Sequence, residues 1–174
     1  MNLNQFPGSL INILLATEDR YFFDHSGVNY SAILRALIVN MRSSGRVEGG
    51  STLTQQLIKN LFLTNQRSYW RKLKEFYMAQ IMDATYSKGR ILELYLNEVY
   101  LGQNGNDAIH GFPLASQYYF GRPVSELTLD QQALLVSMLK GPAIYNPRNH
   151  PEKAIERRNV ILQVIYEQGI IDEK

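Results

Sequence analysis

The sequence predicts a mainly α-helical fold, and three observations support this expectation. Apolar residues recur at three- and four-residue spacings along most of the chain, helix start and stop signals bound several of these stretches, and no run alternates convincingly between apolar and polar residues. A length of 174 residues suits one domain with one core, and 45% hydrophobic with 20% charged residues is an ordinary globular composition. We therefore expect residues 1–174 to form a single helical domain.

The clearest helix is expected at residues 129–139. Thr128 and Gln131 have the spacing of a capping box before an apolar run, and Lys140, Gly141 and Pro142 then supply a C-terminal charge, a C-cap glycine and a stop. The other helices are expected at residues 8–19, 30–41, 52–62, 68–86, 88–101 and 112–119, with a last one opening around residue 149.

The last helix also carries signals at both ends. Pro151 falls in its first turn and Gly169 closes it, while Ile155, Leu162 and Ile165 are expected on one side. These three residues should form the face that packs against the rest of the domain.

Charge is unevenly distributed along the chain. The net charge is only +2, but residues 42–90 contain nine Lys and Arg against three Asp and Glu. A basic middle third suits an anionic partner such as a diphosphate, a nucleic acid or an anionic membrane surface, although a solvated helix face would have the same composition. The absence of cysteine excludes disulfides and thiol chemistry and leaves the redox compartment open.

The stretch from Tyr30 to Met41 is nearly all apolar, interrupted mainly by Ser31, Arg35 and Asn40. No run in the chain reaches the roughly 18 apolar residues that a membrane-spanning helix needs, and the N-terminus lacks the pattern of a signal peptide. Periodicity alone therefore favours a buried core helix at this stretch over membrane contact.

A carboxylate stands out on the first expected helix. Ile11, Leu14 and Leu15 follow the spacing of one apolar face, and Glu18 falls on the same face. Burial would raise the pKa of this carboxyl toward the range that is useful in proton transfer. The alternative is an ordinary, partly buried glutamate that pairs with Arg20.

Two further segments gather polar side chains near helix ends. Residues 18–27 place acids, aromatics and His25 where the first helix must end. Residues 49–60 form a glycine turn that enters a helix, where Thr52, Gln56 and Lys59 put a hydroxyl, an amide and an ammonium on one face. Ordinary helix initiation would explain the turn, but the combined polar face suits a polar ligand.

Arg67, Arg71 and Lys72 precede Glu75 at spacings that place these cations on the turns before the carboxylate. Glu75 could simply pair with the cations of its own helix. The functional alternative is that the cations bind phosphate while Glu75 holds them in register or meets a metal, because fixed cations stabilise a departing diphosphate. No cluster has zinc or calcium spacing, and no Walker loop or dinucleotide fingerprint is present, so a dedicated metal site is not expected.

Five blocks of this sequence together resemble the family 51 glycosyltransferases, which are the peptidoglycan polymerases of class A penicillin-binding proteins and their monofunctional relatives. The blocks are residues 18–27, 49–56, 71–75, 88–102 and the stretch around 157–162. Their order and spacing also agree with the family, and the resemblance covers essentially the whole chain.

The resemblance implies a lysozyme-like fold with a head lobe and a smaller, membrane-facing jaw lobe at about residues 30–50. On this basis Tyr30 to Met41 would contact the membrane and not the core. The resemblance further implies that Glu18 is the general base that takes a proton from the acceptor's 4-hydroxyl, and that Glu75 assists at the donor's diphosphate. Substrate-binding positions would be Asp19, His25, Thr52, Gln56, Lys59, Asn60, Arg67, Arg71, Lys72, Lys140 and Asn146.

The activity implied is polymerisation of lipid II into β-1,4-linked glycan, with inversion and release of undecaprenyl diphosphate. Its partners would be lipid II, the growing strand, a membrane surface and other cell-wall synthesis proteins, with no nucleic acid. No tightly bound cofactor is expected, and a divalent cation such as Mg²⁺ acting with the substrate's diphosphate is the one candidate. The chain would lie peripherally on the outer, periplasmic face of the cytoplasmic membrane, anchored through a longer protein.

Two departures from the family pattern stand out. Relatives commonly have serine where this chain has Ala143, which affects hydrogen bonding to substrate but not the chemistry. The chain also contains neither a transmembrane segment nor a transpeptidase domain, so it should polymerise glycan without cross-linking it.

Two other function classes are open. A lysozyme-like or lytic enzyme would use an inward glutamate to protonate a leaving sugar oxygen and would need no phosphate-binding cations. A non-catalytic module that docks on membranes or partners would not need Glu18 or Glu75, and both are present.

Overall fold

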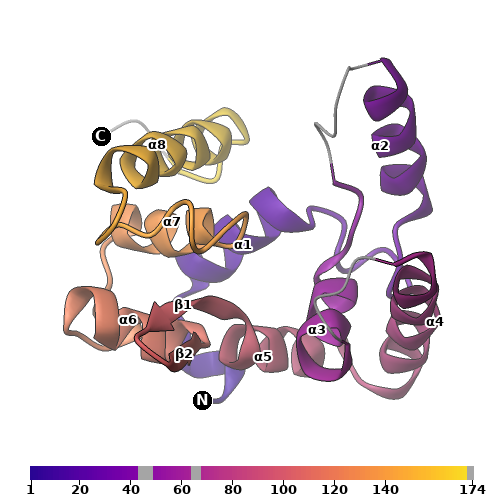
Figure 1. Cartoon of the computed structure of the whole chain (residues 1–174), viewed down its shortest axis with the longest axis horizontal. Helices are drawn as coiled ribbons and strands as arrows, with labels where there is room; N and C mark the ends of the chain where they lie inside the picture. The colour runs from indigo at the N-terminus through magenta and orange to yellow at the C-terminus, as the bar shows by residue number, and fades with distance from the viewer. Residues whose placement is uncertain (43–48, 64–67, 172–174) are drawn as a thin grey trace. The chain divides into compact units, whose positions relative to one another are not determined.

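The computed structural model describes residues 1–42, 49–63 and 68–171, and helices dominate it (Figure 1). The chain divides into two compact units, one of Met1–Arg20 with Glu93–Lys174 and the other of Tyr21–Leu92. The expectation of a single domain stays a prediction. No helix in the described ranges is long and apolar enough to cross a membrane.

The first unit is built around α7 (Leu129–Met138), in which every residue from 132 to 138 is buried. This helix packs against α1 (Gly8–Glu18) and α8 (Pro151–Glu167), which also pack against each other. A helix that is buried all round needs to be mainly apolar, and the two buried polar side chains of this run, Gln132 and Ser137, donate hydrogen bonds to the carbonyls of Leu127 and Leu134. The same unit holds α6 (Phe112–Phe120) and the short 3-10 turns η1 (Leu3–Gln5) and η2 (Val124–Glu126).

The helix ends follow the sequence signals. The backbone N–H of Thr128 donates to Oε1 of Gln131 at 3.1 Å, as the capping box predicts. Gly169 has a φ of 67° and ends α8, where the N–H of Ile170 bonds to the carbonyl of Ile165 at 2.9 Å. These bonds satisfy backbone groups that a helix end leaves unpaired.

One packing prediction for α8 was wrong. Ile155 is 45% exposed, and the buried residues of this helix are Ala154, Ile161 and Ile165. The buried stripe is therefore rotated by about one residue from the predicted face, although Ile165 belongs to both.

A β-hairpin replaces the end of the expected helix at 88–101. Helix α5 (Lys88–Glu98) stops at Glu98, and β1 (Tyr100–Asn104) then pairs antiparallel with β2 (Asp107–His110). The loop between the paired residues Asn104 and Asp107 holds only two residues, and Gly105 has a φ of 58°. Glycine at the first position of a two-residue loop is a hairpin signal, and the prediction of no strand here was wrong.

The second unit contains α2 (Tyr30–Arg42), α3 (Leu53–Phe62) and α4 (Tyr69–Thr85), together with the start of α5. Helices α3 and α4 pack against each other. Helix α3 begins at the predicted cap, where Thr52 and Gln55 exchange hydrogen bonds of 3.1 and 3.2 Å.

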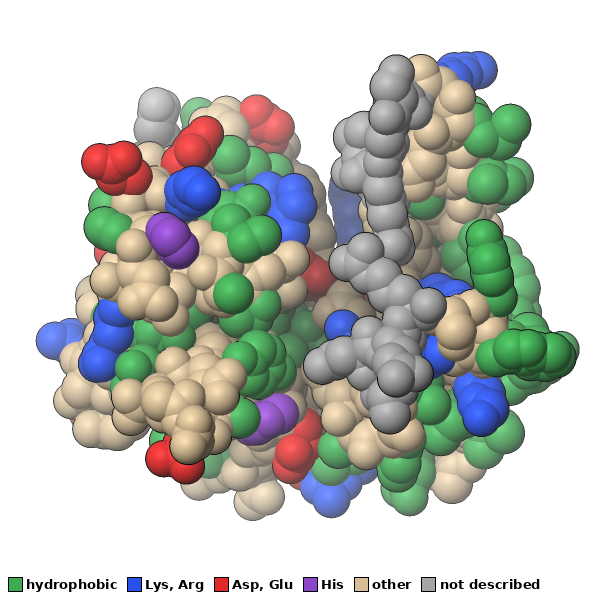
Figure 2. All heavy atoms as spheres, in the orientation of Figure 1, with side chains coloured by type: hydrophobic (Ala, Val, Ile, Leu, Met, Phe, Trp, Pro, Cys, Tyr) green, Lys and Arg blue, Asp and Glu red, His purple; other side chains and the backbone are tan. Residues whose placement is uncertain are grey.

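Helix α2 is not a core helix, so the interpretation from periodicity alone was wrong. Among its residues only Ala36 is buried, while Leu34 is 59% and Met41 is 78% exposed. Apolar side chains are visible at the surface over α2 in Figure 2. The expected jaw at 30–50 includes residues 43–48, which lie outside the described residues, and the assignment of head and jaw lobes stays a prediction.

Candidate active site

Glu18 is the last residue of α1 and is half-buried. The buried face of this helix consists of Leu10, Ile13 and Leu14, one position away from the face predicted from Ile11 and Leu15. Glu18 therefore stands at the edge of the apolar face and not at its centre. A carboxylate at such an edge is shielded on one side and can still reach a ligand.

Tyr95 on α5 lies close enough to Glu18 and Asp19 to sense both carboxylates. Its side chain is fully buried, and Asp19 is only 7% exposed. Burial raises the pKa of the Tyr95 hydroxyl well above its ordinary value, and the negative charges of Glu18 and Asp19 raise it further. No local pattern pointed to this neighbour, because Tyr95 occupies an apolar position of its helix.

In the second unit, Thr52 holds the segment that follows Glu18 in the chain. Its hydroxyl donates to the carbonyl of Gly27 at 2.6 Å and accepts the N–H of Gln55 at 3.2 Å. Gly27 has a φ of 78°, and a Cβ there would lie 2.3 Å from the carbonyl oxygen of Ala79 on α4. The buried Thr52 thus has a structural role at this turn, and its predicted contact with substrate stays a prediction.

A cluster of cations surrounds Glu75 on α4, and we refer to Lys59, Arg71, Lys72 and Glu75 as the basic cluster. Glu75 is 3% exposed; Nη1 of Arg71 donates to its Oε2 at 3.2 Å, and Nζ of Lys72 bonds to its Oε1. Three cations share one carboxylate, so the cluster keeps an excess of positive charge. The structure shows the pairing within one helix that the sequence left as one alternative for Glu75.

The same surroundings lower the pKa of Lys59. Burial lowers this pKa below its usual range, the carboxylate of Glu75 partly opposes the shift, and Arg71 and Lys72 lower the pKa further. An ammonium in these surroundings gains from an anion that adds negative charge. The basic cluster is therefore electrostatically suited to bind phosphate.

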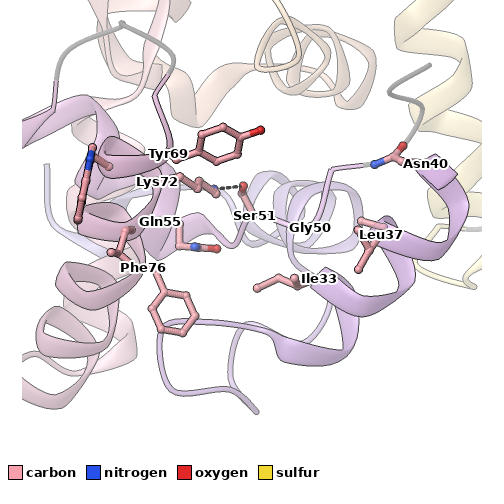
Figure 3. Close-up of a pocket in the computed structure, with 12 residues that line it drawn as sticks. Ile33, Leu37, Asn40, Gly50, Ser51, Gln55, Tyr69, Lys72 and Phe76 are labelled. Carbon is pink, nitrogen blue, oxygen red and sulfur yellow. Dashed lines mark hydrogen bonds between the residues drawn. The ribbon is translucent and has the colours of Figure 1, made fainter.

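Next to the basic cluster lies an apolar groove between α2 and α4 of about 760 Å³ (Figure 3). Lys72 reaches its edge, where Nζ donates to Oγ of Ser51 at 2.7 Å. The groove is lined by Ile33, Ala36, Leu37, Asn40, Gly50, Ser51, Gln55, Tyr69, Trp70, Lys72, Leu73 and Phe76. A cationic edge beside a mainly apolar floor suits an amphiphile with an anionic head.

The remaining predicted site residues fall in different places. Gln56 and Asn60 are half-buried on α3, on the same helix as Lys59. Lys140 is exposed just after α7, and Asn146 is buried with its Oδ1 accepting the N–H of Arg148 at 2.9 Å. Arg67 lies outside the described residues.

His25 was predicted from its segment, and the structure adds a contact that sequence reasoning missed. The backbone carbonyl of His25 accepts a hydrogen bond from Nζ of Lys88, the first residue of α5. No sequence signal links residues 63 positions apart. Over the described ranges no three His, Cys, Asp or Glu side chains are grouped so that they could hold a metal ion.

The chain is similar in sequence to a known protein family over nearly its whole length. The family model described as transglycosylase matches residues 1–166. The chain belongs to the transglycosylase family. Penicillin-binding protein 1B of Escherichia coli (strain K12) is 62% identical over 97% of this chain, and that of Vibrio cholerae is 58% identical over 97%. Penicillin-binding protein 1A of Aquifex aeolicus is 48% identical over 98% of the chain.

The transglycosylase match includes both candidate carboxylates and the whole basic cluster. The chain spans about a fifth of the length of the relatives that it matches, from 20% to 23% in these three cases.

Proposed function

We propose that this chain is a peptidoglycan glycosyltransferase that polymerises lipid II into β-1,4-linked glycan strands and releases undecaprenyl diphosphate. Membership of the transglycosylase family supports this activity. The observation that carries the proposal is the basic cluster beside the apolar groove, because lipid II joins an anionic diphosphate to a long hydrocarbon chain.

The basic cluster would bind the donor's diphosphate. Negative charge grows on the leaving diphosphate in the transition state, and cations that are already held in place stabilise it without reorganising. Glu75 would keep Arg71 and Lys72 in register through its two ion pairs. The lowered pKa of Lys59 would return toward its usual range when the anion binds.

The apolar groove would hold the first part of the donor's hydrocarbon chain. Leu37 and Leu73 are 56% and 45% exposed on its two walls, so a hydrocarbon chain there would remove apolar surface from water. Lys72 at the edge would place the diphosphate at the end of the chain. Replacing Leu37 with glutamate should weaken binding of a long-chain donor more than that of a short-chain analogue.

Glu18 would act as the general base. Its carboxylate would take the proton of the acceptor's 4-hydroxyl while that oxygen attacks the donor's anomeric carbon and the bond to the diphosphate breaks. Attack from the face opposite the leaving group inverts the configuration in a single step. No covalent sugar on the enzyme is then needed, and an α-linked donor gives a β-linked product.

The growing glycan strand would remain bound between additions through its terminal diphosphate at the basic cluster. Arg71→Ala should therefore shorten the products as well as slow the reaction. Unchanged product length in this variant would contradict retention at the basic cluster, and an α-linked product from the unaltered chain would contradict single displacement.

A divalent cation such as Mg²⁺ would act with the substrate's diphosphate and not in a cage of protein ligands. The cation would neutralise part of the charge that develops on the leaving group. Stimulation by added Mg²⁺, reversed by a chelator, is the expected result. Turnover that a chelator leaves unchanged would remove this part of the proposal.

The surface around the groove would rest on the outer face of the cytoplasmic membrane, where lipid II is met. Tyr69 and Trp70 begin α4 with exposed fractions of 97% and 74%, and aromatic residues of this kind favour the membrane interface. Contact would be peripheral in this chain. We also propose that other cell-wall synthesis proteins are partners of the protein.

The competing lytic function fits the second unit less well. Cleavage of finished glycan involves no diphosphate, so it gives no role to three cations around one buried carboxylate. Incubation with finished cell wall would give soluble fragments from a lytic enzyme and none from a polymerase.

The decisive experiment is polymerisation of labelled lipid II in detergent, read as a ladder of products. The unaltered chain should give the ladder, and Glu18→Gln should lower turnover by at least about 10² to 10⁴ while remaining folded by circular dichroism. Glu156→Gln, an exposed change on α8, is the matched control. If the folded Glu18→Gln variant keeps more than about a tenth of normal turnover, the general base is assigned wrongly.

A further inference from the structure

Lys88 makes three contacts around one ammonium group. Its Nζ donates to the carbonyl oxygen of His25 at 2.5 Å and to Oδ1 of Asp83 at 2.6 Å. It also lies 4.8 Å from the centroid of the Phe22 ring. An ammonium has three donors and is attracted to the face of an aromatic ring, so two of its donors are paired here and the ring adds a further attraction.

The partners of Lys88 come from separate parts of the second unit. Phe22 and His25 belong to the segment that follows Glu18, Asp83 lies near the end of α4, and Lys88 begins α5. Its side chain is 21% exposed and that of Asp83 is 11% exposed. A pair that is largely shielded from water depends less on salt than a surface pair, and removing one partner leaves the other uncompensated.

The same segment is fixed at its other end by backbone contacts. The carbonyl of Gly27 accepts the Thr52 hydroxyl at 2.6 Å, and Gly27 packs directly against the backbone of α4. Phe22 is fully buried, and its ring meets that of His25 edge-on at 6.1 Å between centroids. Lys88 is therefore a contact that holds the backbone of His25 itself.

We propose that Lys88 is a positioning residue of the proposed glycosyltransferase. It holds the backbone of His25 and the ring of Phe22 so that His25, a substrate-binding position implied by the family resemblance, is correctly placed. The inference rests on the proposed function. Misplacement of a substrate-binding group by about 1 Å lowers turnover by about 10²-fold, so a local shift would suffice. Asp83 serves as the counter-ion that keeps the ammonium in position.

The test uses the absence of cysteine from this chain. Lys88→Cys introduces a single thiol, and its thiolate displaces bromide from 2-bromoethylamine to form a C–S bond, which restores an ammonium at nearly the original length. Alkylation with 1-bromopropane gives a neutral side chain of similar size. The unaltered chain and Lys153→Cys, an exposed position on α8, pass through the same steps as controls.

Turnover per folded molecule should fall by about 10- to 100-fold in Lys88→Cys and in its propyl form, and should return to within about threefold of normal in the aminoethyl form. Binding of farnesyl diphosphate, which probes the basic cluster, should stay within about threefold of normal in all forms, because the contacts of Lys88 within the described part of the chain are with His25, Asp83 and Phe22 and not with the cluster. General loss of structure would lower both quantities together. Asp83→Asn keeps the shape of its side chain and should lower turnover in the same direction.

Normal turnover in the propyl form, or a loss that the aminoethyl group does not repair, would overturn the positioning role. If Lys88→Cys does not fold, folded Asp83→Asn decides in its place, and normal turnover there contradicts the inference. The absence of a product ladder from the unaltered chain would instead overturn the proposed function, and this inference with it.

Discussion

Replacing Glu75 with glutamine removes the one negative charge that the basic cluster shares among three cations. The side chain keeps its shape, but only one of its two terminal atoms can still accept a hydrogen bond. The NH₂ group is itself a donor and would face a cationic donor of Arg71 or Lys72. Because Glu75 is 3% exposed, water cannot replace the lost charge.

The expected cost follows from the two ion pairs. Hydrogen bonds to charged groups contribute about 1.5–3 kcal/mol each. Glutamine retains one acceptor, and the contribution of Lys72 must be discounted because its side chain is 45% exposed. We therefore expect Glu75→Gln to lower the free energy of unfolding by about 2 kcal/mol, which corresponds to a fall of about 4–8 °C in Tm for a chain of this size.

The activity should fall further than the stability. Loss of one preorganised electrostatic contact costs about 10² to 10³ in turnover. Urea unfolding followed by circular dichroism measures the first effect, and lipid II polymerisation per folded molecule measures the second. Glu156→Gln is the exposed control on α8. A stability within about 0.5 kcal/mol of this control would refute the view that Glu75 offsets part of the repulsion among these cations.

Three further outcomes are expected. The lowered pKa of Lys59 means that affinity for farnesyl diphosphate, measured by calorimetry, should fall as pH rises through that pKa below 10.5, and a pH-independent affinity would contradict this. Gly27→Ala should cost at least about 2 kcal/mol in urea unfolding because its Cβ would meet the backbone of Ala79, whereas Gly105→Ala has a similar φ with open space and should cost less. Burial raises the pKa of Tyr119 from 10.0 to about 12. Because the unfolded chain loses this proton at a lower pH than the folded chain, the contribution of Tyr119 to the free energy of unfolding is present below pH 10 and is lost as pH rises toward 12. Tyr119→Phe should make unfolding less sensitive to pH over that window, and identical profiles would contradict the shift.

Local signals predicted most of the helices because the unpaired backbone groups at their ends form hydrogen bonds with residues nearby in the sequence. The capping boxes at Thr52 and Thr128 and the glycine at the end of α8 involve residues within a few positions of each other. Such contacts depend little on the rest of the fold. The hairpin at 100–110 was missed because its short strands lack an alternating pattern, although the glycine of its turn was a usable signal.

The candidate site was predictable only in part, because some of its contacts are local in sequence and others join distant residues. The order of Arg71, Lys72 and Glu75 on one helix follows from spacing, and the structure shows their pairing. The contacts of Lys88 with His25 and of Thr52 with Gly27 join residues 63 and 25 positions apart, and no local pattern encodes them. The apolar groove likewise requires α2 and α4 to come together.

The two groups of ion pairs in the second unit differ in a way that bears on function. Lys88 and Asp83 form a one-to-one pair whose charges cancel, and the remaining donors of the ammonium serve the backbone and a ring. Around Glu75 the charges do not cancel. Burial is the main cause of the lowered pKa of Lys59, and Arg71 and Lys72 lower this pKa further. A protein that needed only a structural pair at this position would not require three cations. We therefore propose that a ligand supplies the missing negative charge, as a diphosphate on a hydrocarbon chain would do beside the groove.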